Sequence, residues 1–296
     1  MNRHAPEDFP FQEIQLIEDI DLISYTVVEG LLSGLHKSPF LGYSNEFASY
    51  RHYIPGDNLR HMDWKLWGRT DKFYVRQFED DTNLECRIIL DASGSMRFGE
   101  VEKFRFARIF SGALSCLMAR QNDAPGISVI GMGPVRSLPC GTGFHHLESL
   151  LLLLSGPTSP PQTAFSRNLA GIGETFRRRG IVVLISDCFD TDQEIFTLMK
   201  RLRIQGHEVI LFHILAREEM EFPYAGEFAM EDSESGNVHQ VNATQFRKKY
   251  LKKFNQFLDE IESGCQQVGA DYRRILSDAP FDKALIEYLE YRTRVR

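Results

Sequence analysis

The chain has 296 residues, of which 43% are hydrophobic and 25% are charged, a composition typical of a soluble globular protein. This length predicts one large domain with an attached region rather than two large domains. The net charge of −7 argues against nucleic acid as the main partner, because a protein that neutralises phosphates needs a basic face.

Other sequence signals bear on the compartment. The five cysteines are scattered and odd in number, and none forms a CxxC pair, which predicts buried thiols in a reducing compartment. Residues 1–10 have no apolar core of a signal peptide, and the most apolar run, residues 147–154, is far shorter than the roughly 20 residues that span a bilayer. We therefore expect a cytoplasmic protein that does not bind a membrane.

Residues 1–83 divide into a helical segment and an irregular one. Apolar residues recur in steps of three and four over residues 13–32, which predicts a helix that Gly34 ends. Residues 35–83 are rich in aromatic residues, arginine, histidine, proline and glycine, and residues 72–78 are a short strand candidate. We expect an N-terminal helix followed by an irregular region that contains strands.

From residue 84 onward, strand patterns alternate with helical patterns. Strands are expected at residues 84–90, 126–131, 135–138, 181–186, 208–214 and 271–276. Helices are expected at residues 103–120, 145–154, 165–178, 191–204, 244–267 and 281–291. The second and third strands flank a Gly-Pro turn and are predicted to form a hairpin, and the acidic insertion 216–242 is predicted to form another that turns at Ser235-Gly236.

This alternation predicts an α/β fold with a doubly wound, mostly parallel sheet, formed by residues 84–296. In such sheets, ligands bind at the carboxyl ends of the strands. The residues that follow each predicted strand are therefore the first place to look for a functional site.

The first strand of the predicted sheet ends in a loop rich in oxygen donors. Asp91, Ser93 and Ser95 alternate along this loop, so an extended backbone directs all three side chains the same way. One carboxylate and two hydroxyls are hard ligands that suit Mg²⁺ or Mn²⁺. For an isolated motif the simpler interpretation is a capped helix N-terminus, with a serine hydroxyl bonded to backbone N–H groups.

Two later residues complete the candidate donor set. Asp187 follows the buried strand 181–186 and supplies a second carboxylate, while Thr163 precedes the helix expected at 165–178. Thr142 is a rival for the threonine position, but it follows the predicted hairpin and is more simply a turn residue.

These residues match the metal-ion-dependent adhesion site of von Willebrand A domains. Its pattern is DxSxS, then a threonine in a later loop, then an aspartate after the next buried strand. Here it reads Asp91-x-Ser93-x-Ser95, Thr163, Asp187. The resemblance implies that the serines and the threonine contact one divalent cation, and that the aspartates often act through water.

A wider resemblance covers nearly the whole chain. Residues 51–65 read RHYIPGDNLRHMDWK and residues 91–96 read DASGSM. Together they resemble the bacterial family called domain of unknown function 58, as do residues 213–223 and 280–292. The family usually has small residues at the positions of Trp67 and Gly68, and often an acid at that of Ala216, so contacts at these positions stay open.

The family resemblance implies a partner. Members are commonly encoded beside MoxR-type AAA+ ATPases and are thought to act as their adaptors in protein maturation. The string from Arg60 to Lys65 has two open interpretations: it pins an irregular segment through a buried Asp–Arg pair, or it forms a second contact surface.

The sequence favours a binding module over an enzyme. It contains no GxSxG string, no Walker A string and no histidine with a defined place near Ser93 or Ser95. Two alternatives remain: a metal-dependent hydrolase that uses the same site, and a structural A domain whose site holds no metal. The prediction is an adaptor that binds Mg²⁺ or Mn²⁺ and, through the metal, an acidic side chain of a MoxR-type ATPase or of its client.

We predict that residues 34–80 pack on the A domain and are not a free arm. Burying their aromatic side chains provides about 1.5–3 kcal/mol for each large side chain. Limited proteolysis should leave this segment intact, and rapid cleavage between Gly42 and Arg76 would contradict the prediction. The aromatic residues concerned are Phe40, Tyr43, Phe47, Tyr50, Tyr53, Trp64, Trp67 and Phe73.

Overall fold

The computed structural model divides the chain into two compact units, residues 32–82 and the rest of the chain. The residues that it describes are Val28, 47–52, Met62, 64–70, 72–78, 84–131, 135–156, Leu169, 171–172, Phe176, 178–189, 192–231 and 238–295. Val28, within the helix expected at 13–32, is helical and fully buried. The rest of that predicted helix lies outside the described residues.

The smaller unit contains a two-stranded antiparallel sheet and a short helix. Strand β1 (Phe47–His52) pairs with β2 (Tyr74–Phe78), which confirms the strand expected at 72–78. Helix α3 (Trp64–Thr70) begins at the end of the family string, where no helix was predicted. The packing of residues 34–80 against the larger unit stays a prediction.

The larger unit is built on a six-stranded sheet in the order β10-β7-β6-β3-β4-β5. All neighbouring strands are parallel except β5, which forms an antiparallel edge beside β4. This order confirms the doubly wound α/β prediction. Strands β4 and β5 are added on one side of β3 and strands β6, β7 and β10 on the other, so the order of the strands reverses between β3 and β6. The strands are β3 (Glu85–Asp91), β4 (Ala124–Ile130), β5 (Arg136–Leu138), β6 (Gly180–Ser186), β7 (Glu208–Leu215) and β10 (Asp271–Leu276).

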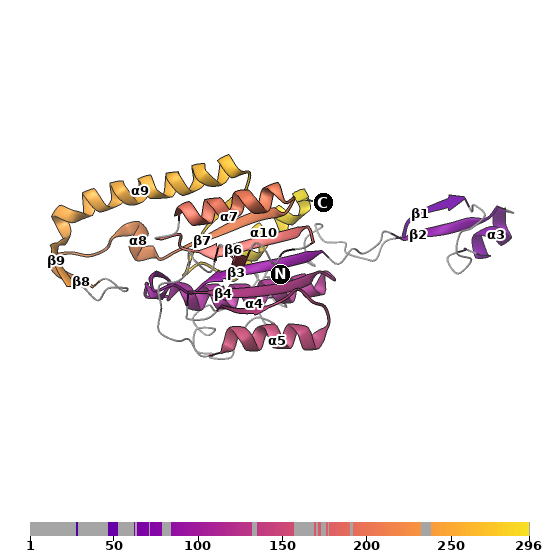
Figure 1. Ribbon diagram of the computed structural model, residues 1–296, viewed down its shortest axis with the longest axis horizontal. Helices are drawn as coiled ribbons and strands as arrows, with labels where there is room; N and C mark the ends of the chain where they lie inside the picture. The colour runs from indigo at the N-terminus through magenta and orange to yellow at the C-terminus, as the bar shows by residue number, and fades with distance from the viewer. Residues whose placement is uncertain are drawn as a thin grey trace, which may run out of the picture. The chain divides into compact units, whose positions relative to one another are not determined.

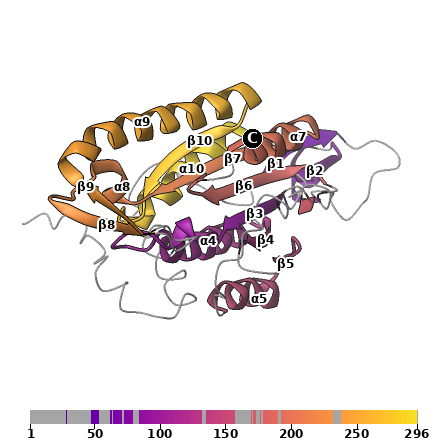
Figure 2. The same cartoon turned by 60° about the vertical axis from the view of Figure 1, so that its left-hand side comes forward.

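Helices cover both faces of this sheet (Figures 1 and 2). On one face, α7 (Asp192–Ile204) and α9 (Ala243–Val268) bury an aliphatic core against β3, β6 and β7. On the other, α4 (Lys103–Arg120) and α10 (Phe281–Val295) meet through stacked rings of Phe106 and Phe281, with centroids 4.7 Å apart. Helix α5 (Phe144–Ser155) packs against α4.

Burial on two faces explains the sequence of the central strands. Every residue of β6 is buried, and so is every residue of β3 after its first. Strands covered on both faces read as continuous apolar runs, which is why these two were clear in the sequence. Of the helix expected at 165–178, Leu169, Gly171 and Ile172 are helical, and most of the remainder is not described.

The insertion 216–242 begins with a short helix, α8 (Arg217–Glu221), that the sequence did not predict. A hairpin of β8 (Glu227–Glu231) and β9 (Val238–Asn242) follows, as expected, although its predicted turn lies outside the described residues. Helix α8 lies at the end of the sheet where β3 finishes (Figure 1). A hydrogen bond shows this contact: the backbone N–H of Glu100, between β3 and α4, donates to Glu218 of α8 at 2.7 Å.

Two further findings concern the cysteines and the length of the apolar helices. No disulfide joins the five cysteines, all of which the structure describes, and four of them are buried. Among the described residues, no helix is both long and apolar enough to span a bilayer.

Candidate metal site

The site lies where two neighbouring parallel strands end. Asp91 is the last residue of β3, and Asp187 directly follows Ser186, the last residue of β6. Strands β3 and β6 pair up to Leu90 and Ile185, so both carboxylates emerge at the same edge of the sheet. This edge is the topological switch point of the fold, where doubly wound sheets bind ligands.

Hydrogen bonds from backbone N–H groups hold the loop after β3 in one conformation. The N–H of Ser93 donates to Oδ1 of Asp91 at 2.8 Å, and the N–H of Ala92 donates to the carbonyl of Ile130 at 2.7 Å. Gly131 has φ +108°, and a Cβ there would lie 2.7 Å from the Ser93 nitrogen. A glycine at this position therefore lets the end of β4 approach the loop closely.

The two serine hydroxyls lie side by side. Ser93 Oγ is 3.0 Å from Ser95 Oγ, and Ser95 Oγ donates to Oδ1 of Asp187 at 3.1 Å. Two oxygens bound in adjacent positions of an octahedral Mg²⁺ ion, at about 2.0–2.1 Å each, lie about 3.0 Å apart. The spacing of this hydroxyl pair therefore fits a shared cation.

The capping interpretation of the serines does not hold. Neither the short 3₁₀ helix Ser95–Arg97 nor α4 has a side-chain hydrogen bond at its N-cap. Both serines are half-buried, whereas Asp91 and Asp187 are buried. The hydroxyls thus form the accessible side of the site and the carboxylates form its floor.

The fifth predicted ligand, Thr163, lies outside the described residues. Its rival Thr142 is exposed and adjoins Gly141, whose N–H donates to the carbonyl of Pro125 at 3.2 Å. Pro125 is at the beginning of β4, so Thr142 lies at the opposite edge of the sheet from Asp91. Thr142 is therefore excluded as a ligand of this site.

Four side chains at or beside the site were not predicted as site residues: Ser186, Lys103, Glu219 and His213. Ser186 Oγ donates to Oδ2 of Asp91 at 2.5 Å and accepts from the N–H of Cys188 at 2.9 Å. Lys103 Nζ lies 2.7 Å from Oδ2 of Asp187 and 2.6 Å from Oε1 of Glu219. Ser186 had a usable signal, because it stands directly before Asp187 at a strand end. Glu219 lies in the stretch 213–223 that carries part of the family resemblance, whereas Lys103 had no signal.

The electrostatics of the site follow from burial. Removal from water, together with the charge of Asp187, raises the pKa of Asp91 to about 7, although Ser186 and Ser93 donate to it. Among the described residues, no three histidine, cysteine, aspartate or glutamate side chains form a group able to hold a metal. A cation here therefore depends on the serine hydroxyls.

His213 is the histidine that touches this site, and its ring is fully engaged. Nε2 bonds to the carbonyl of Asp187 and Nδ1 to the hydroxyl of Tyr272, both at 2.8 Å. Burial lowers the pKa of His213 to about 4, so the ring is neutral at physiological pH. Its bond to the carbonyl of Asp187 supports the loop after β6, and both ring nitrogens are engaged.

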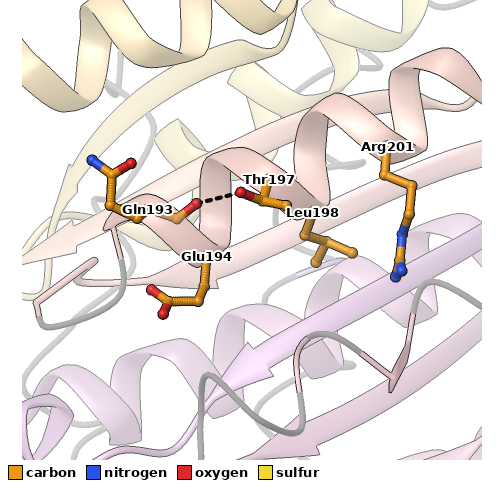
Figure 3. Close-up of a pocket in the computed structure, with 5 residues that line it drawn as sticks. All are labelled: Gln193, Glu194, Thr197, Leu198 and Arg201. Atoms are coloured by element: carbon orange, nitrogen blue, oxygen red, sulfur yellow. Dashed lines mark hydrogen bonds between the residues drawn. The ribbon is translucent and has the colours of Figure 1, made fainter.

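The described cavities lie away from these residues. A pocket of about 200 Å³ opens on α7, where Glu194, Leu198 and Arg201 lie along one side of the helix (Figure 3). A larger cavity of about 650 Å³ includes Arg87 and Arg178 among its lining residues. None of the four described metal candidates is among the described lining residues of either cavity.

Fold and site together define a doubly wound α/β domain with an oxygen-lined site at its switch point. A family model described as "Protein of unknown function DUF58" matches residues 49–257. The chain belongs to this family, which confirms the resemblance carried by residues 51–65 and 91–96.

Relatives with similar sequences extend over much of the chain. The uncharacterized protein Rv1480 of Mycobacterium tuberculosis strain H37Rv is 29% identical over 235 residues, which are 76% of this chain and 72% of that protein. The uncharacterized protein YeaD of Bacillus subtilis strain 168 is 26% identical over 110 residues, which are 37% of this chain and 26% of that protein.

Solved structures with a similar chain path include BatB from Bacteroides thetaiotaomicron. It is 17% identical with a TM-score of 0.47, over 71% of this chain and 99% of that one. The SpRpn10 VWA domain is 13% identical with a TM-score of 0.40, over 69% and 94% of the two chains. The assignment of the fold therefore rests on the strand order of the sheet and not on these two structures.

The raised pKa of Asp91 predicts an unusual pH dependence of stability. In EDTA, protonation of Asp91 should add about 2 kcal/mol to the free energy of unfolding as the pH falls from about 7 to about 5. The sign follows because the folded state takes up a proton below pH 7, whereas in the unfolded state an aspartate takes it up only near its ordinary pKa of about 3.9. The buried, neutral His213 opposes this with a loss of similar size, so the contribution of Asp91 is read as the difference between the wild type and Asp91→Asn. Urea unfolding at both pH values measures it.

Asp91→Asn is the control for this measurement, because it keeps the shape of the side chain and removes the titrating group. This variant should lack most of the rise in the free energy of unfolding that protonation of Asp91 produces between pH 7 and pH 5. An identical pH dependence in the wild type and in Asp91→Asn would contradict the assignment.

Proposed function

We propose that this chain is a protein-binding module that depends on one divalent cation, Mg²⁺ or Mn²⁺, and that it is not an enzyme. The observation that carries the proposal is the 3.0 Å pair of Ser93 and Ser95 hydroxyls beside the buried Asp91 and Asp187. Such a pair of neutral oxygens above two carboxylates suits a hard cation and leaves it accessible from outside.

Each residue has a distinct part in this proposal. Ser93 and Ser95 hold the cation directly, with Thr163 as the expected third hydroxyl, and Asp91 and Asp187 balance its charge from below. When bound, the cation attracts an anionic oxygen of the partner. Because Mg²⁺ usually keeps water in protein sites, a carboxylate of a partner can replace that water on the exposed side.

The partner that we propose is a MoxR-type AAA+ ATPase or its client, docked through an aspartate or glutamate. This follows the family resemblance, since members are commonly encoded beside such ATPases. The acidic insertion that contains α8 and the β8–β9 hairpin is the competing contact surface, since α8 lies at the same end of the sheet.

The surroundings of the site support binding rather than hydrolysis. A metal-dependent hydrolase needs a base that accepts a proton from water near neutral pH. His213 is neutral but buried, with both ring nitrogens engaged, and the pKa of Lys103 is raised, so that its ammonium group stays protonated. Neither residue is able to accept that proton. Asp91 has a pKa of about 7 without a cation, but a divalent charge bound beside it would lower that pKa and make the carboxylate a poor base.

Calorimetric titration with MgCl₂ or MnCl₂ tests the metal site. The double variant Ser93→Ala/Ser95→Ala should bind the cation more weakly by more than about tenfold, because it removes two direct ligands. Ser149→Ala is the matched control, since Ser149 is exposed on α5 and its hydroxyl bonds only within that helix. Equal metal affinity in the wild type and the double variant would sink this assignment.

Pull-down of a MoxR-type AAA+ ATPase from the same organism tests the docking mode. We expect capture by the wild type with Mg²⁺, and its loss in EDTA or with Ser93→Ala/Ser95→Ala. A deletion of residues 226–238 separates the competing surface. Binding that ignores both EDTA and the serine changes, but fails with the deletion, would assign the contact to the insertion instead.

A further inference from the structure

A buried ammonium group lies directly beneath the candidate metal site. Lys103, the first residue of α4, is completely buried, and its Nζ lies 2.7 Å from Asp187 and 2.6 Å from Glu219. Lysine is almost never fully buried, and the N-terminus of a helix is the end where a positive charge is unfavourable. A charge in so costly a place needs compensation from its surroundings.

The surroundings keep this lysine charged. Burial alone would lower the pKa of Lys103, but the charges of Asp187 and Glu219 outweigh it and raise the pKa above its ordinary value. Nζ also lies over the rings of Phe189 and Phe98, at 5.0 and 5.9 Å from their centroids. A permanent positive charge therefore shares Asp187 with any cation that the site holds.

Glu219 ties this lysine to the insertion. Its Oε1 accepts from Lys103, and its Oε2 accepts from the backbone N–H of Ala216 at 2.8 Å, at the beginning of α8. The carboxylate is thus fixed on α8 and shares the Lys103 ammonium group with Asp187. Hydrogen bonds connect Ser95, Asp187, Lys103 and Glu219 in one continuous series.

We propose that Lys103 is a tethered cation that sets the metal affinity of the site by competing for Asp187, and that Glu219 on α8 opposes it. This inference rests on the proposed metal function. Lys103 repels a divalent ion and keeps part of the charge of Asp187 occupied, so it weakens metal binding. Glu219 offsets the lysine charge and strengthens binding. The metal affinity is thereby coupled to the position of α8, beside the proposed docking face.

The two residues therefore make opposite predictions. Lys103→Met should raise the affinity for Mg²⁺ at least about tenfold, because it removes a like charge from the low-dielectric floor of the site. Glu219→Gln should lower the affinity severalfold, because it keeps the acceptor for the Ala216 N–H but removes the charge that balances Lys103. A purely structural role would lower the affinity in both variants.

The experiment is calorimetric titration of the full chain with MgCl₂ and, separately, MnCl₂. The variants are Lys103→Met, Glu219→Gln and their combination, with Lys252→Met as the matched control because Lys252 is exposed on α9. The combination should lie between the single variants, and the control should match the wild type. The shift in melting temperature on adding Mg²⁺ gives a second readout and should be largest for Lys103→Met.

The outcomes separate the two proposals. Higher metal affinity in Lys103→Met together with lower metal affinity in Glu219→Gln supports the inference, and so does metal binding that appears only in Lys103→Met. Lower affinity in both variants, or wild-type affinity in both, overturns it and leaves the metal function standing. No binding of either metal by any protein overturns both. If Lys103→Met does not fold, Lys103→Gln takes its place, because it removes the charge but keeps a hydrogen-bond donor. Lys103→Gln should bind Mg²⁺ more tightly than the wild type while Glu219→Gln binds it more weakly, and any other ranking overturns the inference.

Discussion

Two carboxylates buried side by side constrain everything at this end of the sheet. Asp91 and Asp187 are at most 1% exposed, and like charges in a medium of low dielectric are costly unless donors surround them. The chain supplies those donors from several directions: the Ser93 N–H and Ser186 hydroxyl to Asp91, and the Ser95 hydroxyl and Lys103 ammonium to Asp187. Each loop here is held because its movement would leave a charge without a partner.

The same constraint extends from the site into the helices that surround it. The N–H of Phe189 donates to Asp187 at 3.2 Å, and the ring of Phe189 contacts both the Lys103 ammonium and the stacked ring of Phe257 on α9. Cys188, between Asp187 and Phe189, has φ 59°, an uncommon conformation for a residue with a side chain. The loop after β6 is thus fixed by charge on one side and by aromatic packing on the other, the rigidity that the proposed docking site would require.

Sequence reasoning succeeded where a local pattern carried the information. Continuous apolar runs gave β3 and β6, helical periodicity gave α4 with both ends correct, and the strand order then brought Asp91 and Asp187 together. It failed where a contact joins residues far apart in the sequence, and where a segment is too short to show a pattern. Lys103 reads as the polar first residue of an amphipathic helix, and its partner Glu219 is 116 residues away. The five residues of α8 are too few to show a helical period.

The missed residues are also those that distinguish this chain from its fold. Any doubly wound sheet directs residues after β3 and β6 to the switch point, so the serines and aspartates occupy a place that the architecture itself provides. Lys103 and Glu219 are different, because they meet only through an insertion that follows β7. Strand β7 is parallel to β6 and ends at the same edge, so an insertion after it begins beside the site. The fold thus fixes where the proposed cation would lie, while the insertion brings a third carboxylate to the floor of that site, where we propose that it adjusts how strongly the cation binds.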